Sequence, residues 1–460
     1  MTIEFARASA STIPVHFADR TSWPKLAKSL SAAARALAAA SGFKAAPGEL
    51  LFAPAAGKPG HVAVFGIDKA GGDPLAPGRL VQLLPPGTYR FANSPPGAED
   101  ALEMAALAWL MGAYRFERYR KQDKALPRLV APKGIDTARV LRLAQSIHLA
   151  RDLVNTPAND MGVPALTAAA LEVAKDYGAK AQVIRGDDLL KRNFPLIHAV
   201  GRAGADAPAL VDIRWGKASA PKVTLVGKGV CFDTGGLDIK PASAMLMMKK
   251  DMAGAAVALG LARAIMDGGL NVNLRLLLPV VENSVAGNSF RPGDVYPSRQ
   301  GISVEIGNTD AEGRLILADA LSLAGEEEPE LMFDFATLTG AARVATGPDL
   351  PAFFCDDDTL ANALMQTGAE ISDPVWRLPL WKPYEAMLAS KVADTNNVSS
   401  GPFAGAITAA LFLKKFAGQA KTWAHFDIYA WNQFAKPGRP EGAEAQTLRL
   451  LYRYLEGRFA

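Results

Sequence analysis

Apolar and polar positions along the first 130 residues predict a small unit of helices and short strands. The alanine-rich stretch 25–41 and the stretch 98–115 repeat their apolar positions with helical spacing. Short apolar runs at 50–53 and 61–66 are typical of strands. Glycine and proline are frequent through 54–100, which indicates surface loops. We find no cluster of catalytic residue types in this part of the chain.

From about residue 135 the pattern changes to strands that alternate with helices. Helices are expected first at 136–153 and 164–177. Farther along, short apolar runs predict strands, and alanine- and leucine-rich segments between them predict helices. These strands are expected at 223–226, 274–281, 302–306 and 331–335, and these helices at 253–266 and 311–324. Apolar strands in alternation with helices favour a mixed or parallel sheet that helices cover on both faces.

These patterns predict an α/β protein of two domains. A smaller N-terminal α/β domain is expected at 1–130, and a larger domain with a central mixed sheet flanked by helices at 131–460. Sites in such sheets lie beyond the carboxyl ends of the strands. We therefore expect the polar residues that follow strands to gather at one edge of the sheet: Asp233, Asn283, Asn308 and Thr337.

Composition narrows the class of protein. The 460 residues are 49% hydrophobic and 21% charged, which is ordinary for a globular protein with a large core. The net charge of +4 is small and no basic block occurs, which argues against a nucleic-acid partner. No run approaches 18 uncharged apolar residues, so no membrane span is expected. Two cysteines and the absence of a signal pattern predict a cytoplasmic protein.

Candidate chemistry appears first in the stretch 308–315, Asn-Thr-Asp-Ala-Glu-Gly-Arg-Leu. Asp310 and Glu312 are two residues apart, and such close carboxylates repel unless Arg314 or a metal ion lies between them. The same residues also fit an ordinary helix start, with a capping oxygen and acids in the first turn. Taken alone, the stretch favours the helix start. Arg314 would then form an ion pair with Asp310 on the helix surface.

A second polar cluster follows the strand expected at 223–226. Lys228, Asp233 and Lys240 come close together among several glycines, and Asp251 precedes an alanine-rich helix. Asp233 also fits a plain turn, and Asp251 a helix cap. Nucleotide-binding glycine motifs, a nucleophile elbow and His-Glu-x-x-His are all absent. A metal site in this chain would therefore use oxygen ligands, which suit Mg and Mn and also bind Zn.

The acids of both clusters would be costly to bring together without cations. Two divalent ions would cancel the charge of four carboxylates, and a pair of ions about 3.5–4 Å apart is the usual arrangement in aminopeptidases and phosphatases. The four acids are Asp233, Asp251, Asp310 and Glu312. The bare chemistry leaves a phosphatase or another two-metal hydrolase open.

The order of the motifs is more specific. Val-Gly-Lys-Gly-x-x-Phe-Asp-x-Gly-Gly is followed by Ile-Lys-Pro, Asp-Met-x-Gly-Ala-Ala and Asn-Thr-Asp-Ala-Glu-Gly-Arg-Leu. Further matching segments lie at 155–159, 336–340 and 405–411. From about Arg151 to the C-terminus the chain resembles the leucyl aminopeptidase (cytosol aminopeptidase, M17) family. The N-terminal unit matches that family by position and size more than by motif.

The resemblance implies a dinuclear-metal peptidase domain at 131–460. It implies two divalent ions per subunit, Zn or Mn with Mg or Co as alternatives, and a bicarbonate at Arg314 as general base. Lys240 would stabilise the oxyanion. The implied metal ligands are Lys228, Asp233, Asp251, Asp310 and Glu312, with Asp233 and Glu312 bridging the ions; the implied substrate-binding residues are Met248, Thr337, Leu338 and Gly340. As a ligand Lys228 must be neutral, whereas the rival interpretation is a charged lysine paired with the acids.

The implied function is release of N-terminal amino acids, Leu and other apolar residues favoured, from peptides by two-metal activation of water. The implied partners are peptides with a free N-terminus and five further copies in a homohexamer. The alternative is a non-catalytic member that binds DNA or regulates; it is weaker because every matched metal and catalytic position carries a suitable residue. Two departures affect the substrate pocket: Lys249 and Lys250 add charge beside Asp251, and 425–432 brings two extra aromatics.

Overall fold

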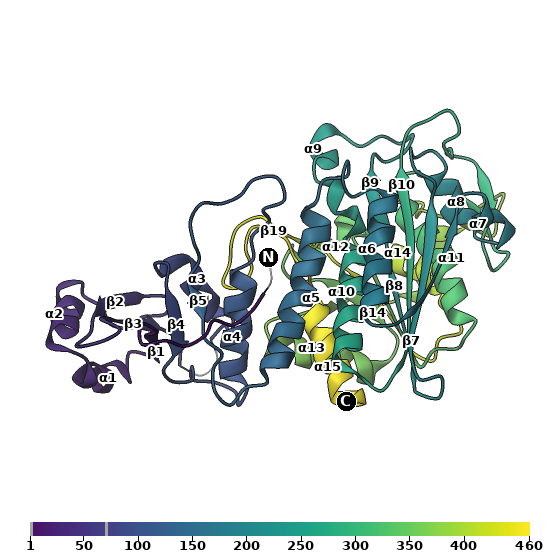
Figure 1. Ribbon diagram of the computed structural model, residues 1–460. Helices are drawn as coiled ribbons and strands as arrows, with labels where there is room; N and C mark the ends of the chain where they lie inside the picture. The colour runs from purple at the N-terminus through teal and green to yellow at the C-terminus, as the bar shows by residue number, and fades with distance from the viewer. Residues whose placement is uncertain (1–2, 70–71) are drawn as a thin grey trace. The chain divides into compact units, whose positions relative to one another are not determined.

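The computed structural model describes residues 3–69 and 72–460, which divide into two compact units (Figure 1). The smaller unit comprises residues up to His148 together with Asn432–Gly442, and the larger one Leu149–Trp431 together with Ala443–Ala460. Helix α5 (Thr137–Asn155) carries the chain from the first unit into the second. The domain division expected at residues 130 and 131 stays a prediction.

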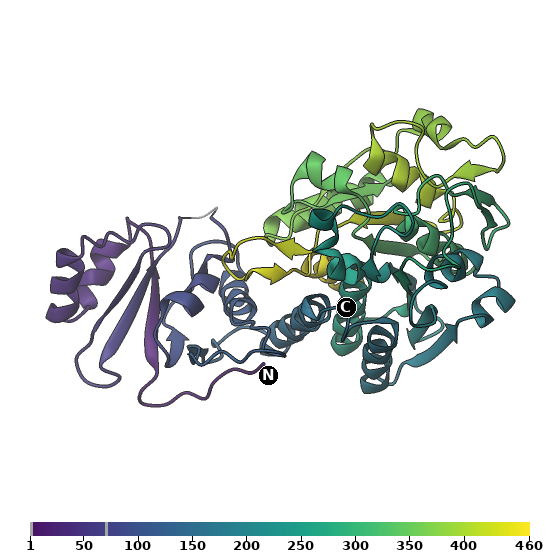
Figure 2. The ribbon, with the colours of Figure 1, turned by 90° about the horizontal axis from the view of Figure 1, so that it is seen from above.

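The smaller unit is built on a five-stranded sheet in the order β2-β3-β1-β4-β5. Both views show α1 and α2 close together beside β2 (Figures 1 and 2), and alanines of α2 pack into a core with residues of β2 and β3. Its strands are β1 (Ile13–Ala18), β2 (Leu50–Pro54), β3 (His61–Gly66), β4 (Thr88–Phe91) and β5 (Arg128–Leu129), and its helices α1 (Trp23–Ser29), α2 (Ala32–Ala40), η1 (Ala76–Arg79), α3 (Leu80–Leu83) and α4 (Ala101–Gly112).

The single helix expected at 25–41 is wrong, because the chain forms two helices there. Leu30 is extended, and the Ser31 hydroxyl accepts a hydrogen bond from the Ala34 N–H at 3.1 Å. A serine cap of this kind begins a new helix. Hydrophobic periodicity alone does not reveal the break between the two helices, because the sequence is alanine-containing and helix-favouring on both sides of it.

The larger unit contains a nine-stranded mixed sheet in the order β15-β14-β17-β13-β8-β10-β7-β6, with β9 continuing the pairing along β10. β8 and β10 are parallel, as are β8 and β13. β7 runs antiparallel to both β10 and β6, whereas β14 runs antiparallel to β17 and parallel to β15. The strands are β6 (Lys180–Arg185), β7 (Ala209–Gly216), β8 (Lys222–Gly227), β9 (Gly229–Asp233), β10 (Asn273–Asn283), β13 (Leu331–Ala336), β14 (Ala352–Cys355), β15 (Trp376–Arg377) and β17 (Trp423–Asp427).

Helices cover both faces of this sheet. Val226, Leu277 and Met332 pack into one core with residues of α8, α11 and α14, while their strand neighbours are equally buried on the opposite face. α10 lies against β8 and β13, and α6 and α15 pack on α10. The helices are α6 (Val163–Asp176), α7 (Asp188–Lys191), α8 (Pro195–Gly201), α9 (Ala242–Met245), η2 (Met248–Met252), α10 (Ala253–Gly268), α11 (Glu312–Gly325), α12 (Gly340–Thr346), α13 (Asp358–Glu370), η3 (Lys382–Leu388), α14 (Gly405–Lys414) and α15 (Leu448–Phe459).

The predicted α/β fold with a mixed sheet flanked by helices is confirmed. The strand expected at 302–306 exists but does not join the central sheet. It forms a separate three-stranded sheet made of β11 (Val295–Pro297), β12 (Ser303–Glu305) and β16 (Thr395–Asn396), and β18 (Trp431–Asn432) pairs with β19 (Gly442–Ala443). Among the described residues, no helix combines the length and the apolar character that a membrane crossing requires.

Candidate metal centre

Asp233 ends β9 at the carboxyl edge of the central sheet. Its Oδ1 accepts hydrogen bonds from the Gly235 N–H and from Asn283 Nδ2, both at 2.8 Å. Gly235 and Gly236 have φ of +87° and +66°, a left-handed conformation that lets the chain turn immediately after the strand. Oδ2 is left facing Lys240 Nζ at 2.8 Å. The turn interpretation of Asp233 therefore holds for one oxygen, and the other oxygen points into the site.

Asp251 reaches the same edge from η2, just before α10 begins. The helix approaches the sheet very closely, because a Cβ on Gly254 would lie 2.1 Å from the Phe335 carbonyl oxygen. The Thr337 hydroxyl donates to Asp251 Oδ1 at 2.7 Å, and Lys228 Nζ lies 2.8 Å from Oδ2. The cap residue of α10 is Met252, without a side-chain cap, so the helix-cap interpretation of Asp251 is wrong.

Asp310 lies in the loop before α11, and Glu312 is the first residue of that helix. The expected polar cap is also absent here, since the helix begins at Glu312 with Ala311 as the cap residue and no side-chain cap bond. The loop is held instead by Asn397, whose Oδ1 accepts from the Gly307 N–H at 2.8 Å and whose Nδ2 donates to the Asn308 carbonyl at 2.7 Å. This arrangement buries Glu312 and directs it towards the sheet.

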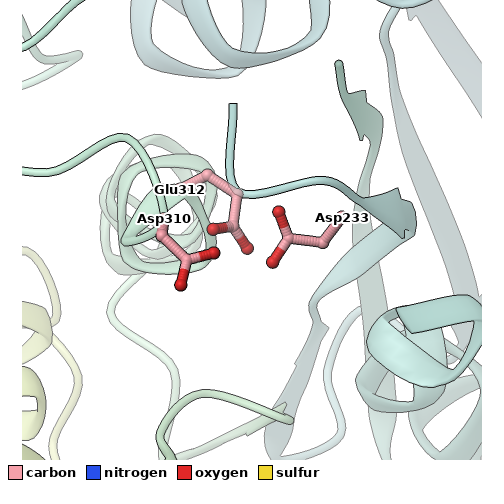
Figure 3. A group of neighbouring side chains, drawn as sticks. All are labelled: Asp233, Asp310 and Glu312. Carbon is pink, nitrogen blue, oxygen red and sulfur yellow. The ribbon is translucent and has the colours of Figure 1, made fainter. Parts of the chain in front are cut away.

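The three carboxylates point towards one another (Figure 3). Asp233, Asp310 and Glu312 each offer an oxygen atom within 4.8 Å of the others. Lys228 Nζ lies 2.9 Å from Glu312 Oε1 and so links Asp251 to this group. Lys240 pairs with Asp310 as well as Asp233. The tertiary structure thus assembles all five expected metal ligands and Lys240 in one place.

The site holds more negative than positive charge. Four carboxylates face two ammonium groups, and the buried Asp251 Oδ2 and Glu312 Oε1 share the single ammonium of Lys228. Burial raises the pKa of Glu312 above its usual value, and the Asp233 charge adds to the effect. Burial acts to lower the pKa of Lys228, but Asp251 and Glu312 hold it above its usual value. The excess of buried negative charge on oxygen ligands fits the demands of a divalent cation.

Arg314 is buried in α11 rather than exposed on its surface. Its Nη1 donates to the Asn397 carbonyl oxygen at 2.7 Å, and its Nε has no partner. Burial lowers the pKa of Arg314 to about 10. The predicted ion pair between Arg314 and Asp310 on the helix surface is therefore wrong, since the residues that the structure describes contain no such pair. A buried guanidinium with a free donor fits a small planar anion.

The residues expected to bind substrate come from η2 and from the segment that follows β13. Thr337 contacts Asp251 directly, and Met248 begins η2 and is half-buried. The Leu338 N–H is taken by Asp427 Oδ1 at 2.9 Å, and Gly340 begins α12. Asp427 was missed in the sequence, although it ends an apolar run at 423–426. That position after a strand is the signal that could have found it.

The two lysines and the two added aromatics noted in the sequence contact each other in the structure. Lys249 Nζ donates to the Asn155 carbonyl at 2.7 Å and lies 5.5 Å from the centre of the Trp431 ring. Lys250 is buried, and its Nζ lies 4.7 Å from the centre of the Tyr429 ring. Each of the two added aromatic rings, Trp431 and Tyr429, therefore has a lysine ammonium over its face, and both lysines directly precede Asp251 in the chain.

Fold and site define an α/β protein with an acidic candidate metal centre at the carboxyl edge of a mixed sheet. Comparison with known proteins is more specific. A model of the cytosol aminopeptidase family catalytic domain matches residues 148–452, and a model of the M17 aminopeptidase N-terminal domain matches 13–132. The chain belongs to the M17 cytosol aminopeptidase family, as its motifs predicted, and is by that membership a peptidase hydrolase.

Relatives agree over most of their length. A probable cytosol aminopeptidase of Geobacter sp. (strain M21) is 40% identical over 385 residues, covering 79% of this chain and 78% of the relative. One from Chlamydia abortus is 41% identical over 377 residues, covering 78% and 75%. The crystal structure of cytosol aminopeptidase from Coxiella burnetii matches with a TM-score of 0.93 at 46% identity over 99% of both chains. The bottromycin maturation enzyme BotP in complex with Mn matches with a TM-score of 0.88 at 32% identity over 98% and 100%.

Proposed function

We propose that this protein is a metal-dependent aminopeptidase that releases N-terminal residues from peptides. The observation that carries the proposal is the buried convergence of Asp233, Asp310 and Glu312 in a chain of the M17 family. The non-catalytic alternative is not carried forward, because no observation favours a DNA-binding or regulatory role. Family membership likewise removes the phosphatase interpretation.

Five residues would hold two divalent ions per subunit. Lys228, Asp233, Asp251 and Glu312 would bind one ion, and Asp233, Asp310 and Glu312 the other. Zn or Mn is proposed, with Mg or Co as alternatives; the Mn complex of BotP supports manganese for that relative. When bound, the ions supply a polarised carbonyl and a water of lowered pKa. Lys228 would give up its proton on ion binding, since nearby divalent charge disfavours an ammonium.

The cations of the chain have separate roles in this proposal. Asp233, Glu312 and Asp310 keep Lys240 protonated, because together they outweigh the effect of burial and raise its pKa. Its ammonium would donate a hydrogen bond to the oxygen that gains charge as the peptide bond is attacked. Arg314 would hold a bicarbonate through its free Nε, and this anion would act as general base.

Recognition of the substrate would begin at its free amine. Asp251 would accept a hydrogen bond from the amine, with Thr337 keeping the carboxylate in place. Met248, Leu338 and Gly340 would contact the first side chain, and a flexible methionine tolerates Leu and other apolar shapes. We further propose a cytoplasmic homohexamer, which sedimentation of the purified protein tests, and retain the division into domains at 1–130 and 131–460.

The test is hydrolysis of leucine 4-nitroanilide by the purified, metal-loaded protein. We expect release of nitroaniline, loss of activity on chelation and recovery with Zn, Mn or Co. The N-acetylated substrate is the matched control and should not be cleaved, because it has no free amine. Failure to hydrolyse any member of a broad aminoacyl panel would sink the proposal.

A further inference from the structure

Lys250 is a buried lysine whose ammonium forms no ion pair or hydrogen bond with the described residues. Its side chain belongs to a residue only 6% exposed, directly before Asp251 in η2. Within the described parts of the chain, its ammonium has no hydrogen-bond acceptor and no carboxylate at ion-pair distance, and it lies over the face of Tyr429 at 4.7 Å from the ring centre. An ammonium in this situation is costly until an acceptor reaches it.

The neighbouring Lys249 does have a hydrogen-bond acceptor for its ammonium, so the lack of one distinguishes Lys250. The two lysines are neighbours in η2, and each lies over an aromatic ring. Lys249 donates to the Asn155 carbonyl at 2.7 Å, so its hydrogen-bonding capacity is partly used within the chain. Lys250 has no such acceptor and remains available to a group from outside.

A second cation faces the same ring. The Arg343 guanidinium lies 5.1 Å from the centre of the Tyr429 ring, and among the described residues it forms no ion pair. Asp427, two residues earlier in the chain, already accepts from the Leu338 and Thr339 N–H groups and from the Thr339 hydroxyl. The charges of Asp251 and Asp427 act on Lys250, but neither carboxylate forms an ion pair with it, and the two cations around one ring together attract an anion.

The position of Lys250 indicates which part of a substrate meets it. The site has Lys240 with Asp310 at one end, and Asp251 with Thr337 at the other. Lys250 follows Met248 by two residues in η2, and its ring partner Tyr429 follows Asp427, the acceptor of the Leu338 N–H, by two residues. Met248 and Leu338 are proposed to contact the first side chain, so Lys250 is linked to that part of a substrate rather than to the leaving peptide.

We propose that Lys250, supported by Arg343 and the Tyr429 ring, binds the side-chain carboxylate of an N-terminal glutamate or aspartate. The methylene groups of such a side chain would lie along Met248, as those of an apolar residue do. Acidic N-terminal residues are thus substrates beside apolar ones. This inference rests on the proposed aminopeptidase function and names a substrate class for the same site.

The test compares kcat/KM for the 4-nitroanilides of Glu, Gln and Leu with the metal-loaded enzyme. Gln matches Glu in shape and lacks only the charge. We expect the wild-type protein to prefer Glu over Gln by roughly ten- to a hundredfold, the range that a hydrogen bond to a charged group supplies. Lys250→Met should bring the ratio close to one and leave Leu hydrolysis within about threefold of wild type. Lys250→Arg should retain the preference.

Lys249→Met is the matched control, since it removes the same charge from the adjacent position and should not change the Glu to Gln ratio. Equal hydrolysis of Glu and Gln by the wild-type protein would refute the subsite and leave the aminopeptidase proposal standing; this result needs no variant to fold. If the metal-loaded wild-type protein hydrolyses none of the three substrates, Leu included, both proposals are wrong.

The C-terminal carboxylate of a short peptide is the competing source of the same chemistry. Leu-Gly and Leu-Gly amide differ only in that group. If Lys250→Met slows Leu-Gly but not its amide, Lys250 binds the C-terminus and the assignment to the first side chain is wrong. Equal effects on both peptides support the assignment.

Discussion

Glu312 is at once the first residue of a helix and the most deeply buried acid of the centre. The helix N-terminus stabilises its charge, and Lys228 lies 2.9 Å away. Even so, burial and the charge of Asp233 keep the pKa of Glu312 raised, and its Oε1 shares the Lys228 ammonium with Asp251. The chain by itself therefore does not satisfy this carboxylate, which is the strongest residue-level argument for a bound ion.

Glu312→Gln tests that argument directly. The amide keeps the shape and removes the charge, so metal content and Leu-anilide hydrolysis should fall by roughly a hundredfold or more, beyond the 10–100-fold typical of groups that only support a ligand. Folding should be preserved, because a buried charge in excess is removed. Metal analysis, kcat/KM and a thermal melt on one preparation check the three outcomes.

Glu326→Gln is the control for this substitution, because it lies at the other end of the same helix and is exposed. It should leave metal content unchanged. Full metal content in Glu312→Gln would remove Glu312 from the proposed bridging position.

At the scale of elements, glycines set how closely the parts of the centre approach one another. Gly254 lets α10 begin against the Phe335 backbone, which brings Asp251 to the site. Gly313 plays the same part for α11: a Cβ there would lie 2.6 Å from Lys228 Nζ and 2.8 Å from its Cδ. Neither glycine has a positive φ, so close approach rather than backbone conformation explains them.

Gly313→Ala should therefore impair the centre without impairing the helix. Alanine favours a helix by about 1 kcal/mol over glycine, whereas the methyl group displaces Lys228. We expect unchanged or slightly higher helix content, with metal affinity lowered roughly ten- to a hundredfold. Titration of the apo-protein with Zn, followed by circular dichroism, measures both quantities.

Gly325→Ala is the matched substitution in α11. Its added Cβ would meet the Gln419 side chain at an ordinary 3.6 Å, far from Lys228. Metal affinity should stay at the wild-type value. If Gly313→Ala binds metal equally well, Lys228 is not held in place by this close approach.

At the scale of the whole molecule, the strands that carry the centre are joined by a buried polar cluster. His425 Nδ1 lies 2.6 Å from Asp334 Oδ1, and Trp423 Nε1 donates to Asp334 Oδ2 at 2.7 Å, which ties β17 to β13. Burial acts to lower the pKa of His425, but the Asp334 carboxylate raises it above the usual value. The stability of the large unit therefore depends on a titrating pair within its sheet.

The sign of the pH dependence follows from the raised pKa. Histidine binds its proton more tightly in the folded protein than in the unfolded chain, so its stabilisation is complete below about pH 6.5. It is lost as the pH rises through the folded-state pKa, by at most about 1.4 kcal/mol per pH unit. We expect the free energy of unfolding of wild type relative to His425→Asn to fall between pH 6 and pH 9 in urea titrations.

Asparagine is chosen because its Nδ2 replaces Nδ1 as donor to Asp334 and does not titrate. His61→Asn, at an exposed position of β3, is the control and should leave the pH profile of wild type intact. A wild-type to His425→Asn difference that is the same at both pH values would show that His425 does not change charge in this range.

Local pattern predicted most elements of this fold, yet it could not assign their partners. The strand at 302–306 was predicted correctly as a strand and wrongly as part of the central sheet, since its pairing with β16 joins distant residues. Asn397 was not predicted at all. It holds the loop before α11 from the far side of that small sheet, and an isolated asparagine carries no local signal of such a role.

The sequence by itself determined the family, the order of the motifs and which acids and cations are present, because these depend on residue type and spacing along the chain. Tertiary structure alone decided how their charges are used. It buried Arg314 away from Asp310, gave Lys249 an acceptor and left Lys250 without one. Burial and partner geometry come from segments far apart in the chain, and in a low-dielectric interior they decide whether a charge is satisfied or free to bind.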